Sequence, residues 1–80
     1  MFSKEKFGAR LLEARKRSNE TQTDLANCIE TTKSHVSEME NGKKTTTAEK
    51  IALICEHYNI SSDYLLGLTD DPEPKGQKKR

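Results

Sequence analysis

A group of short polar side chains near the middle of the chain carries the most chemistry in this sequence. Lys33, Ser37 and Asn41 recur at intervals of four residues, so on a helix they form one stripe, which Ser34 and Glu38 flank. Every one of these side chains forms hydrogen bonds, and none is a large apolar group. A helix about 10–12 Å across fits the major groove of B-DNA, where each base pair presents a distinct pattern of donors and acceptors. The stripe therefore predicts contact with base edges.

Two charged members of this group have specific expected partners. Lys33 suits the O6 and N7 acceptors of guanine, and Glu38 suits the N4 donor of cytosine. The alternative for both is an ordinary solvated helix surface. A carboxylate near phosphates is repelled unless it finds such a donor, so Glu38 favours selectivity over general affinity.

Helical segments are predicted to position these residues, because apolar side chains recur at helical spacing and no strand pattern or repeat occurs. The predicted segments are about Ser3–Arg17, Gln22–Ile29, Thr32–Asn41, Thr46 or Thr47 to Asn59, and Ser62–Leu66. Thr21 and Asp24 form a capping-box pattern at the start of the second segment, and Gly42 is a strong stop after the third. A turn of about three residues, Glu30-Thr31-Thr32, joins the second and third segments, which is the helix-turn-helix arrangement. The predicted fold class is all-α with five helices.

Longer motifs support this interpretation. They are Gln22-x-x-Leu25-Ala26-x-x-Ile29, then Thr32, Ser34, Val36 and Glu40-Asn41-Gly42-Lys43, and finally Ser61-x-Asp63-Tyr64-Leu65-Leu66-Gly67. Together they resemble the lambda-repressor-like, Xre-type helix-turn-helix domain of phage and bacterial repressors, over about Phe7 to Gly67 without an insertion. The resemblance implies a compact five-helix DNA-binding domain, here residues 1–68, that inserts its third helix into the major groove of double-stranded DNA as a transcriptional regulator.

The resemblance also implies roles for individual residues. With the polar stripe, it gives a set of residues expected to contact bases: Thr32, Lys33, Ser34, Ser37 and Glu38. The residues expected to contact phosphates are Gln22, Asn41, Lys43 and Lys44, with Arg10 as a weaker candidate. Gln22 is also expected to brace the reading side chains. Arg15 and Glu40 match a pair that forms an internal salt bridge, which the inward position of Glu40 beside Val36 and Met39 independently favours.

Four positions depart from the family pattern, namely Glu20, Glu30, Thr31 and Thr46, and two of them bear most on the turns. Glu30 occupies the turn position that is often glycine, so it either takes a different backbone conformation or accepts mild strain. Glu20 stands where a buried leucine is usual, so we expect a looser first turn between the first two helices.

A homodimer is expected for two reasons. One helix reads only a few base pairs, and two half-sites about 34 Å apart would raise specificity on a palindromic operator. Family members of this size often dimerise through the fifth helix and the residues after it. Leu66 and Leu68 are left over once the core is filled, so we place them in that interface. The resemblance to phage and bacterial repressors leads us to expect that the regulator is a repressor.

Composition and charge narrow the remaining classes. The net charge of +1 arises after residue 67, because residues 1–67 carry ten basic and ten acidic side chains. Residues 69–80 combine an acidic, proline-containing stretch with a basic end and are expected to form a flexible tail. No apolar run is long enough for a membrane span or a secretory signal, and two cysteines without such a signal indicate reduced thiols in the cytoplasm.

Other chemistry is sparse. His35 and His57 are far apart, and neither has a ligand partner four residues on, so no metal site is expected. No phosphate loop, nucleophile motif or paired-carboxylate arrangement occurs, so neither enzymatic activity nor a cofactor is expected. Two alternatives stay open: an antitoxin-like or adaptor module that uses the same fold to hold a protein, and a nonspecific nucleic-acid binder driven by the basic tail.

Overall fold

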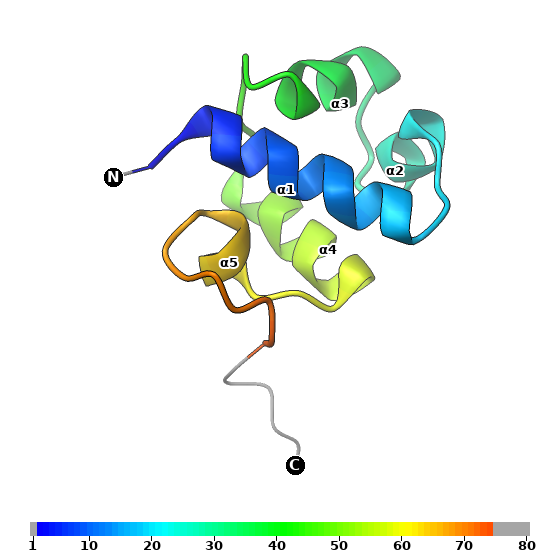
Figure 1. Ribbon diagram of the computed structural model, residues 1–80. Coiled ribbons are helices and arrows are strands. Elements are labelled where there is room, and N and C mark those ends of the chain that lie inside the picture. Colours follow the sequence, from blue (N-terminus) through cyan, green and yellow to red (C-terminus); the bar gives the residue numbers. More distant parts are fainter. Residues whose placement is uncertain (1, 75–80) are drawn as a thin grey trace.

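The computed structural model describes residues 2–74 and consists of five helices (Figure 1). The helices are α1 (Lys4–Arg17), α2 (Gln22–Cys28), α3 (Lys33–Glu40), α4 (Ala48–Tyr58) and α5 (Ser62–Leu65). The part of the chain that the structure describes contains no strand. The predicted all-α class and the order of the five helices are confirmed, and the predicted ends differ from the observed ones by at most two residues.

A hydroxyl side chain caps the start of every helix. In each case its oxygen accepts a hydrogen bond from a backbone N–H of the first turn, and the capping residues are Ser3, Thr21, Thr32, Thr47 and Ser61. Thr21 and Asp24 form the predicted reciprocal capping box. Each cap contributes about 1 kcal/mol. Five caps therefore help a chain with few apolar residues to form helices as short as α2 and α5.

All five helices contribute to one apolar core. The largest fully buried side chains are Phe7, Leu11, Leu25, Ile29, Val36, Met39, Ile54 and Leu65. Cys55 is buried in the same cluster and Cys28 packs partly against it, both as free thiols. Burial raises the pKa of the Cys55 thiol, because the thiolate would lose its hydration. The cysteines are thus core side chains, as their positions in the sequence indicate.

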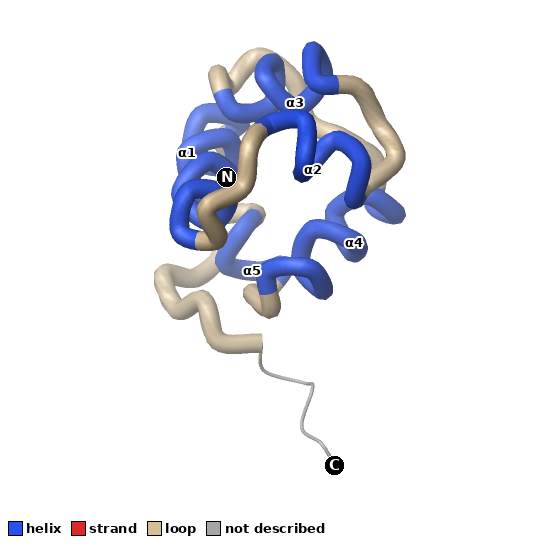
Figure 2. The backbone as a smooth tube through the Cα atoms, turned by 90° about the vertical axis from the view of Figure 1, so that its right-hand side faces the viewer, coloured by secondary structure: helices blue, strands red, loops and turns tan. Residues whose placement is uncertain are grey.

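The helices place α3 at one side of the molecule and α5 at the opposite side, as Figures 1 and 2 both show. Helix α1 runs between them and touches both. Gly8 allows α1 to approach the end of α3, because a Cβ atom there would lie 2.2 Å from the carbonyl oxygen of Met39. The position of α3 is therefore fixed by α1 from below and by α2 from the side.

The segment after α5 folds back onto the helices, which corrects one expectation. Arg10 on α1 donates to the carbonyl oxygen of Thr69 at 2.7 Å, to the Asp70 carboxylate at 2.7 Å and to the carbonyl oxygen of Tyr64. The backbone N–H of Ser61 donates to the carbonyl oxygen of Pro72 at 2.9 Å. The expected flexible tail from residue 69 is therefore wrong for residues 69–74, and residues 75–80 lie outside the described residues.

Neither a membrane span nor a metal cluster occurs among the described residues. No helix among them is both long enough and apolar enough to cross a membrane. Their His, Cys, Asp and Glu side chains form no group of three or more that could hold a metal ion.

Candidate nucleic-acid interface

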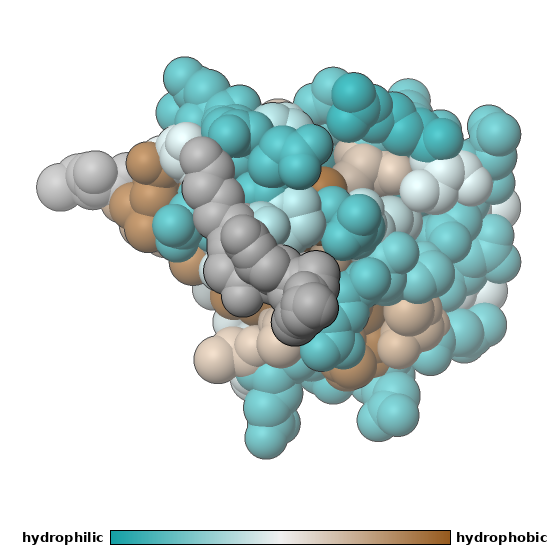
Figure 3. Space-filling view, turned by 90° about the horizontal axis from the view of Figure 1, so that it is seen from below, coloured by the Kyte–Doolittle hydropathy of each residue, from teal (hydrophilic) through white to brown (hydrophobic). Residues whose placement is uncertain are grey.

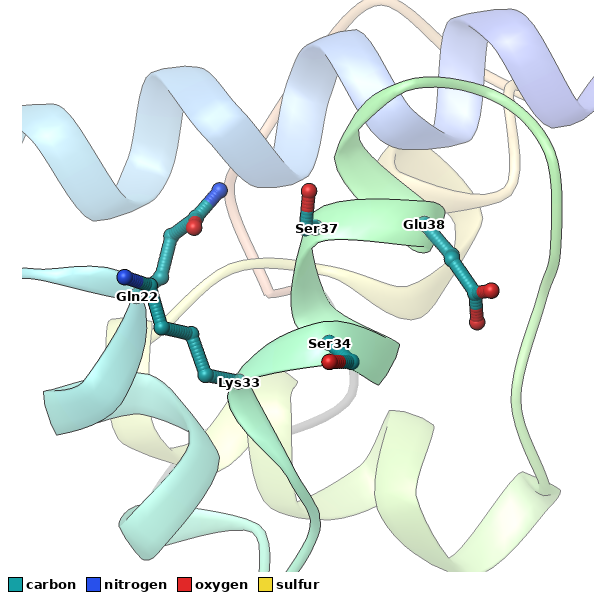
Figure 4. A pocket seen from close by; sticks show the side chains of 5 residues that line it. All are labelled: Gln22, Lys33, Ser34, Ser37 and Glu38. Carbon is teal, nitrogen blue, oxygen red and sulfur yellow. The ribbon is translucent and has the colours of Figure 1, made fainter.

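The outward side of α3 and the start of α2 together form a shallow hollow of about 560 Å³. Its lining consists of Gln22, Lys33, Ser34, Ser37 and Glu38. Figure 4 shows Gln22 and Lys33 at one edge, Glu38 at the other, and the two serines between them. The structure thus brings together four of the five residues expected to contact bases, with Gln22 beside them. No large apolar side chain lines this surface.

Thr32, the fifth residue of the expected base-contacting set, begins α3 rather than lining the hollow. Its hydroxyl oxygen accepts a hydrogen bond from the backbone N–H of His35 at 3.1 Å, and the residue is exposed. The hydroxyl proton remains available to an outside acceptor, because the cap uses only an oxygen lone pair.

A buried ion pair supports the interface from behind. Arg15 donates to Glu40 from Nε at 2.6 Å and from Nη2 at 3.0 Å, so the expected internal salt bridge is present in two-pronged form. These hydrogen bonds and the charge of Glu40 raise the pKa of the Arg15 guanidinium. Gln22 Nε2 donates to the same carboxylate at 3.0 Å. The bracing expected of Gln22 is therefore directed to Glu40.

The loop after α3 presents the other expected phosphate contacts. Asn41 ends the helix, and Gly42 takes a φ of 77°, which glycine adopts without strain. The backbone N–H groups of Lys43 and Lys44 both donate to the carbonyl oxygen of Glu38, which folds the loop against the helix end. Lys44 Nζ lies 3.7 Å from Glu38 Oε1. The exposed cations of the loop thus stand next to the acidic edge of the hollow.

Arg10 lies elsewhere. Its guanidinium donates to Tyr64, Thr69 and Asp70 and stacks over the Tyr64 ring at 4.0 Å, on the side of the molecule that carries α5. These interactions use three of its five N–H groups and hold it beside α5, so the structure does not bring Arg10 together with the other expected phosphate contacts.

The turn between α2 and α3 keeps the left-handed conformation that the family usually gives to glycine. Glu30 has a φ of 59°, so of the two possibilities left open by the sequence, the turn accepts strain. Lys50 on α4 donates to the carbonyl oxygens of Ile29 and Glu30 at 3.0 and 3.2 Å. The sequence reasoning missed this interaction, because a lysine early in a helix gives no signal of a distant acceptor.

Glu20 is firmly anchored, which corrects the expected looseness of the first turn. Its carboxylate accepts from the Tyr58 hydroxyl and lies against His57 Nε2, both at 2.7 Å. Its backbone carbonyl accepts from Arg15 at 2.6 Å. Burial, followed by the hydrogen bond to Glu20, raises the pKa of Tyr58 well above its ordinary range. A polar network around Glu20 therefore stands where the family usually has a buried leucine. The sequence feature that could have indicated this network was an acidic residue at a position that is usually apolar.

The residues expected at a dimer interface differ in exposure. Leu66 is half-buried and packs against the core, whereas Leu68 is 68% exposed. Phe2 is also exposed, at 45%, and was missed by the sequence reasoning. Figure 3, seen from the side of α5, shows apolar side chains reaching the surface in separate patches among polar ones.

Comparison with known proteins gives matches across most of the chain. A family model described as "Helix-turn-helix domain" matches residues 8–70. An uncharacterised helix-turn-helix-type transcriptional regulator of Bacillus subtilis, YobD, is 39% identical over 70 residues, which cover 88% of this chain; the chain spans 62% of the length of that relative.

Solved structures share the fold. The clp gene regulator ClgR from Corynebacterium glutamicum has a TM-score of 0.71 and 28% identity, over 79% of this chain and 67% of that one. The P22 c2 repressor, solved in complex with a synthetic operator, has a TM-score of 0.72 and 23% identity, over 75% of this chain and 91% of that one. The five-helix, lambda-repressor-like fold is therefore confirmed, and the chain belongs to the helix-turn-helix domain family.

Proposed function

We propose that this protein binds double-stranded DNA sequence-specifically as a transcriptional regulator, by inserting α3 into the major groove. The supporting observation is the hollow on α3, whose five lining residues all carry side-chain groups that can donate or accept hydrogen bonds. Two similar proteins add support: YobD is named a helix-turn-helix-type transcriptional regulator, and ClgR, which shares the fold, is named a clp gene regulator.

Within this proposal, the side chains divide by task. Base edges are read from α3 by Thr32, Lys33, Ser34, Ser37 and Glu38. Phosphates are contacted from the rim by Gln22, Asn41, Lys43 and Lys44, which fixes the register of α3. Residues 1–67 are electrically neutral. We therefore expect modest nonspecific affinity and a strong dependence on base readout.

The proposal includes a homodimer that acts as a repressor on a palindromic operator. One α3 helix covers only a few base pairs, and a second copy on the adjacent half-site would double the contacts. Leu68, exposed beside α5, is the main candidate for the interface, with Leu66 as its partly buried neighbour. Sedimentation of the full chain with and without operator DNA is expected to show a dimer in at least one state. Monomer alone in both states would contradict the dimer.

A module that holds a protein partner, as an antitoxin or adaptor does, is the alternative from another class. Such a module would need exposed aliphatic side chains on the outward side of α3. The hollow there is lined by polar and charged side chains only. This observation favours DNA over a protein partner at that surface.

Selection of bound sequences from a random duplex pool tests the function directly. We expect enrichment of one palindromic sequence with half-sites about 34 Å apart. Failure of the full chain to enrich any sequence above the starting pool would overturn the proposal.

The same selection with Glu38→Gln tests the readout set. The amide should relax the preference at one base position in each half-site, because it donates as well as accepts a hydrogen bond. Glu49→Gln on α4 is the matched control, because it removes the same negative charge from an exposed position outside the hollow. It should leave every base preference unchanged. An unchanged profile for Glu38→Gln would remove Glu38 from the base-reading set.

A further inference from the structure

The turn between α2 and α3 is held by a lysine from a helix later in the chain. Lys50, in the first turn of α4, places its ammonium 3.0 Å from the carbonyl oxygen of Ile29 and 3.2 Å from that of Glu30. We propose that Lys50 is a positioning residue for DNA recognition, which fixes the angle at which α3 leaves α2 without contacting DNA itself. This inference rests on the proposed DNA-binding function.

The turn needs such support because its conformation is locally unfavourable. Glu30 has a φ of 59°, a left-handed conformation in which the Cβ atom of any residue except glycine crowds the backbone. A glycine would take this conformation without strain. Hydrogen bonds from another helix to the carbonyl groups of the turn offset part of this cost.

Helix α2 supplies this support only in part, because the hydrogen bond from Glu30 N to the carbonyl oxygen of Asn27 is long, at 3.4 Å. It is seven residues long and has no basic residue in its last turn, although the partial negative charge of a helix C-terminus favours a cation there. Its earlier carbonyls are used within the motif: Ile29 N donates to Leu25 and Thr31 N donates to Ala26, at 3.1 and 2.8 Å. Lys50 binds two carbonyls that lie just beyond the end of the helix. Lys50 thus provides from α4 the cation that α2 lacks.

The direction of α3 depends on this turn. Thr32, which caps α3, comes two residues after Glu30, so a change in the Glu30 dihedral angles swings the whole helix. The hollow draws Gln22 from α2 and its other lining residues from α3, so its shape depends on the angle between the two helices. A recognition site of this kind needs its residues held within about 0.5 Å. Removal of the Lys50 hydrogen bonds should therefore impair base readout more than phosphate attraction.

The first experiment compares Lys50→Met with Lys6→Met in the full chain. Both variants remove one positive charge, and Lys6 lies beside Gly67 at the end of α5, away from the turn. Affinities are measured for the selected duplex and for a scrambled one, at a temperature where circular dichroism shows each variant folded. Relative to Lys6→Met, Lys50→Met should lower the affinity for the selected duplex about three- to tenfold, because only part of the free energy of the lost hydrogen bonds is spent on holding α3 in its binding orientation. The affinities for the scrambled duplex should be equal.

Rescue at position 30 separates positioning from general stability. In the Lys50→Met background, Glu30→Gly should restore the ratio of selected to scrambled affinity, because glycine holds the turn without outside help. Glu30→Gln in the same background changes the charge equally but keeps the Cβ atom, so it should not restore the ratio. Lys50→Arg, which keeps the cation and its donors, should behave like the unmodified chain.

Amide exchange tests the Lys50 interaction independently of DNA. The Thr31 amide should exchange faster in Lys50→Met than in Lys6→Met, and Glu30→Gly should reverse the change, while the Leu11 amide in the core of α1 stays the same. If the unmodified chain enriches no duplex, the proposed function fails, and this measurement still reports on the turn. Equal selected-duplex affinity in Lys50→Met and Lys6→Met would overturn the positioning role, whether or not Thr31 exchange differs. Rescue by Glu30→Gln would overturn it as well.

Discussion

Glu40 accepts three hydrogen bonds, two from Arg15 and one from Gln22, and its side chain is 4% exposed. A carboxylate so deeply placed is tolerated only when it is paired, because it has lost its hydration. The same group joins α1 to α3 and orients the amide of Gln22 at the edge of the hollow. At this residue, the stability of the fold and the shape of the hollow depend on one set of atoms.

Arg15→Ala should therefore be strongly destabilising. The change leaves the Glu40 carboxylate buried without its cation, and breaking a buried pair in this way costs about 3–5 kcal/mol. Urea denaturation followed by circular dichroism measures the free energy of unfolding. Arg17→Ala removes an exposed arginine from the same helix and should change stability by less than about 0.5 kcal/mol. An Arg15→Ala variant as stable as Arg17→Ala would refute a structural role for the pair.

The raised pKa of Tyr58 predicts that the protein loses stability in alkaline solution. Burial and the hydrogen bond to Glu20 raise the pKa of its phenol in the folded state above the ordinary value of about 10. The stabilisation is complete below pH 10, and it declines above pH 10 because only the unfolded chain then releases the proton. Urea midpoints between pH 8 and 11 should fall, and the fall should be smaller in Tyr58→Phe. Identical pH profiles for the two proteins would exclude Tyr58 as the source.

Among the helices, what the sequence predicts well is what is determined locally. Capping residues such as Thr21 and the stop at Gly42 act within one turn, so helix ends follow from neighbours in the sequence. The interactions that were missed join distant segments: Lys50 lies 20 residues beyond Glu30, and Tyr58 lies 38 beyond Glu20. For the site, the α3 surface followed from helical periodicity, whereas the true place of Arg10 required knowing where residues 69–74 return.

The close crossing of α1 and α3 predicts that Gly8→Ala destabilises the protein, although helix propensity alone predicts that it stabilises α1. Alanine favours a helix over glycine by about 1 kcal/mol, so Gly8→Ala would stabilise an isolated α1. In the folded protein the new Cβ would lie 2.2 Å from the Met39 carbonyl oxygen, which forces the helices apart. We expect a net loss of about 1–3 kcal/mol, measured by urea denaturation. Ala9→Gly at the exposed neighbouring position is the control for propensity alone, and a stabilised Gly8→Ala would show that α1 and α3 are less closely packed.

At the scale of the whole molecule, the helix proposed to bind DNA and the C-terminal residues 69–74 lie on different sides. Helix α3 lies at one side, and residues 69–74 lie with α5 at the other, in both views of the chain (Figures 1 and 2). The domain measures 36 × 27 × 22 Å, so two copies with centres about 34 Å apart would meet only along an edge.

Truncation at two points separates the roles of the C-terminal residues. A chain ending at Pro74 lacks four basic side chains, Lys75, Lys78, Lys79 and Arg80. It should still bind the selected duplex, and the log–log slope of its salt dependence should weaken by about 0.9 for each phosphate that the removed side chains neutralise. A chain ending at Leu68 should in addition unfold at lower urea concentration, because Arg10 loses Thr69 and Asp70. Abolished binding in the chain ending at Pro74 would instead favour the nonspecific, tail-driven alternative.

The hydrogen bonds of Arg10 also bear on how the domain forms during protein synthesis. Thr69 and Asp70 follow Arg10 by 59 and 60 residues, and Leu65 completes the core only shortly before them. At about 5–20 residues per second, the ribosome needs roughly 3–12 s to add these residues after Arg10. For most of that interval α1 lacks α5, which packs against it in the folded domain. The nascent chain therefore exposes apolar surface, to which chaperones can bind, until α5 and the residues that follow it have been synthesised.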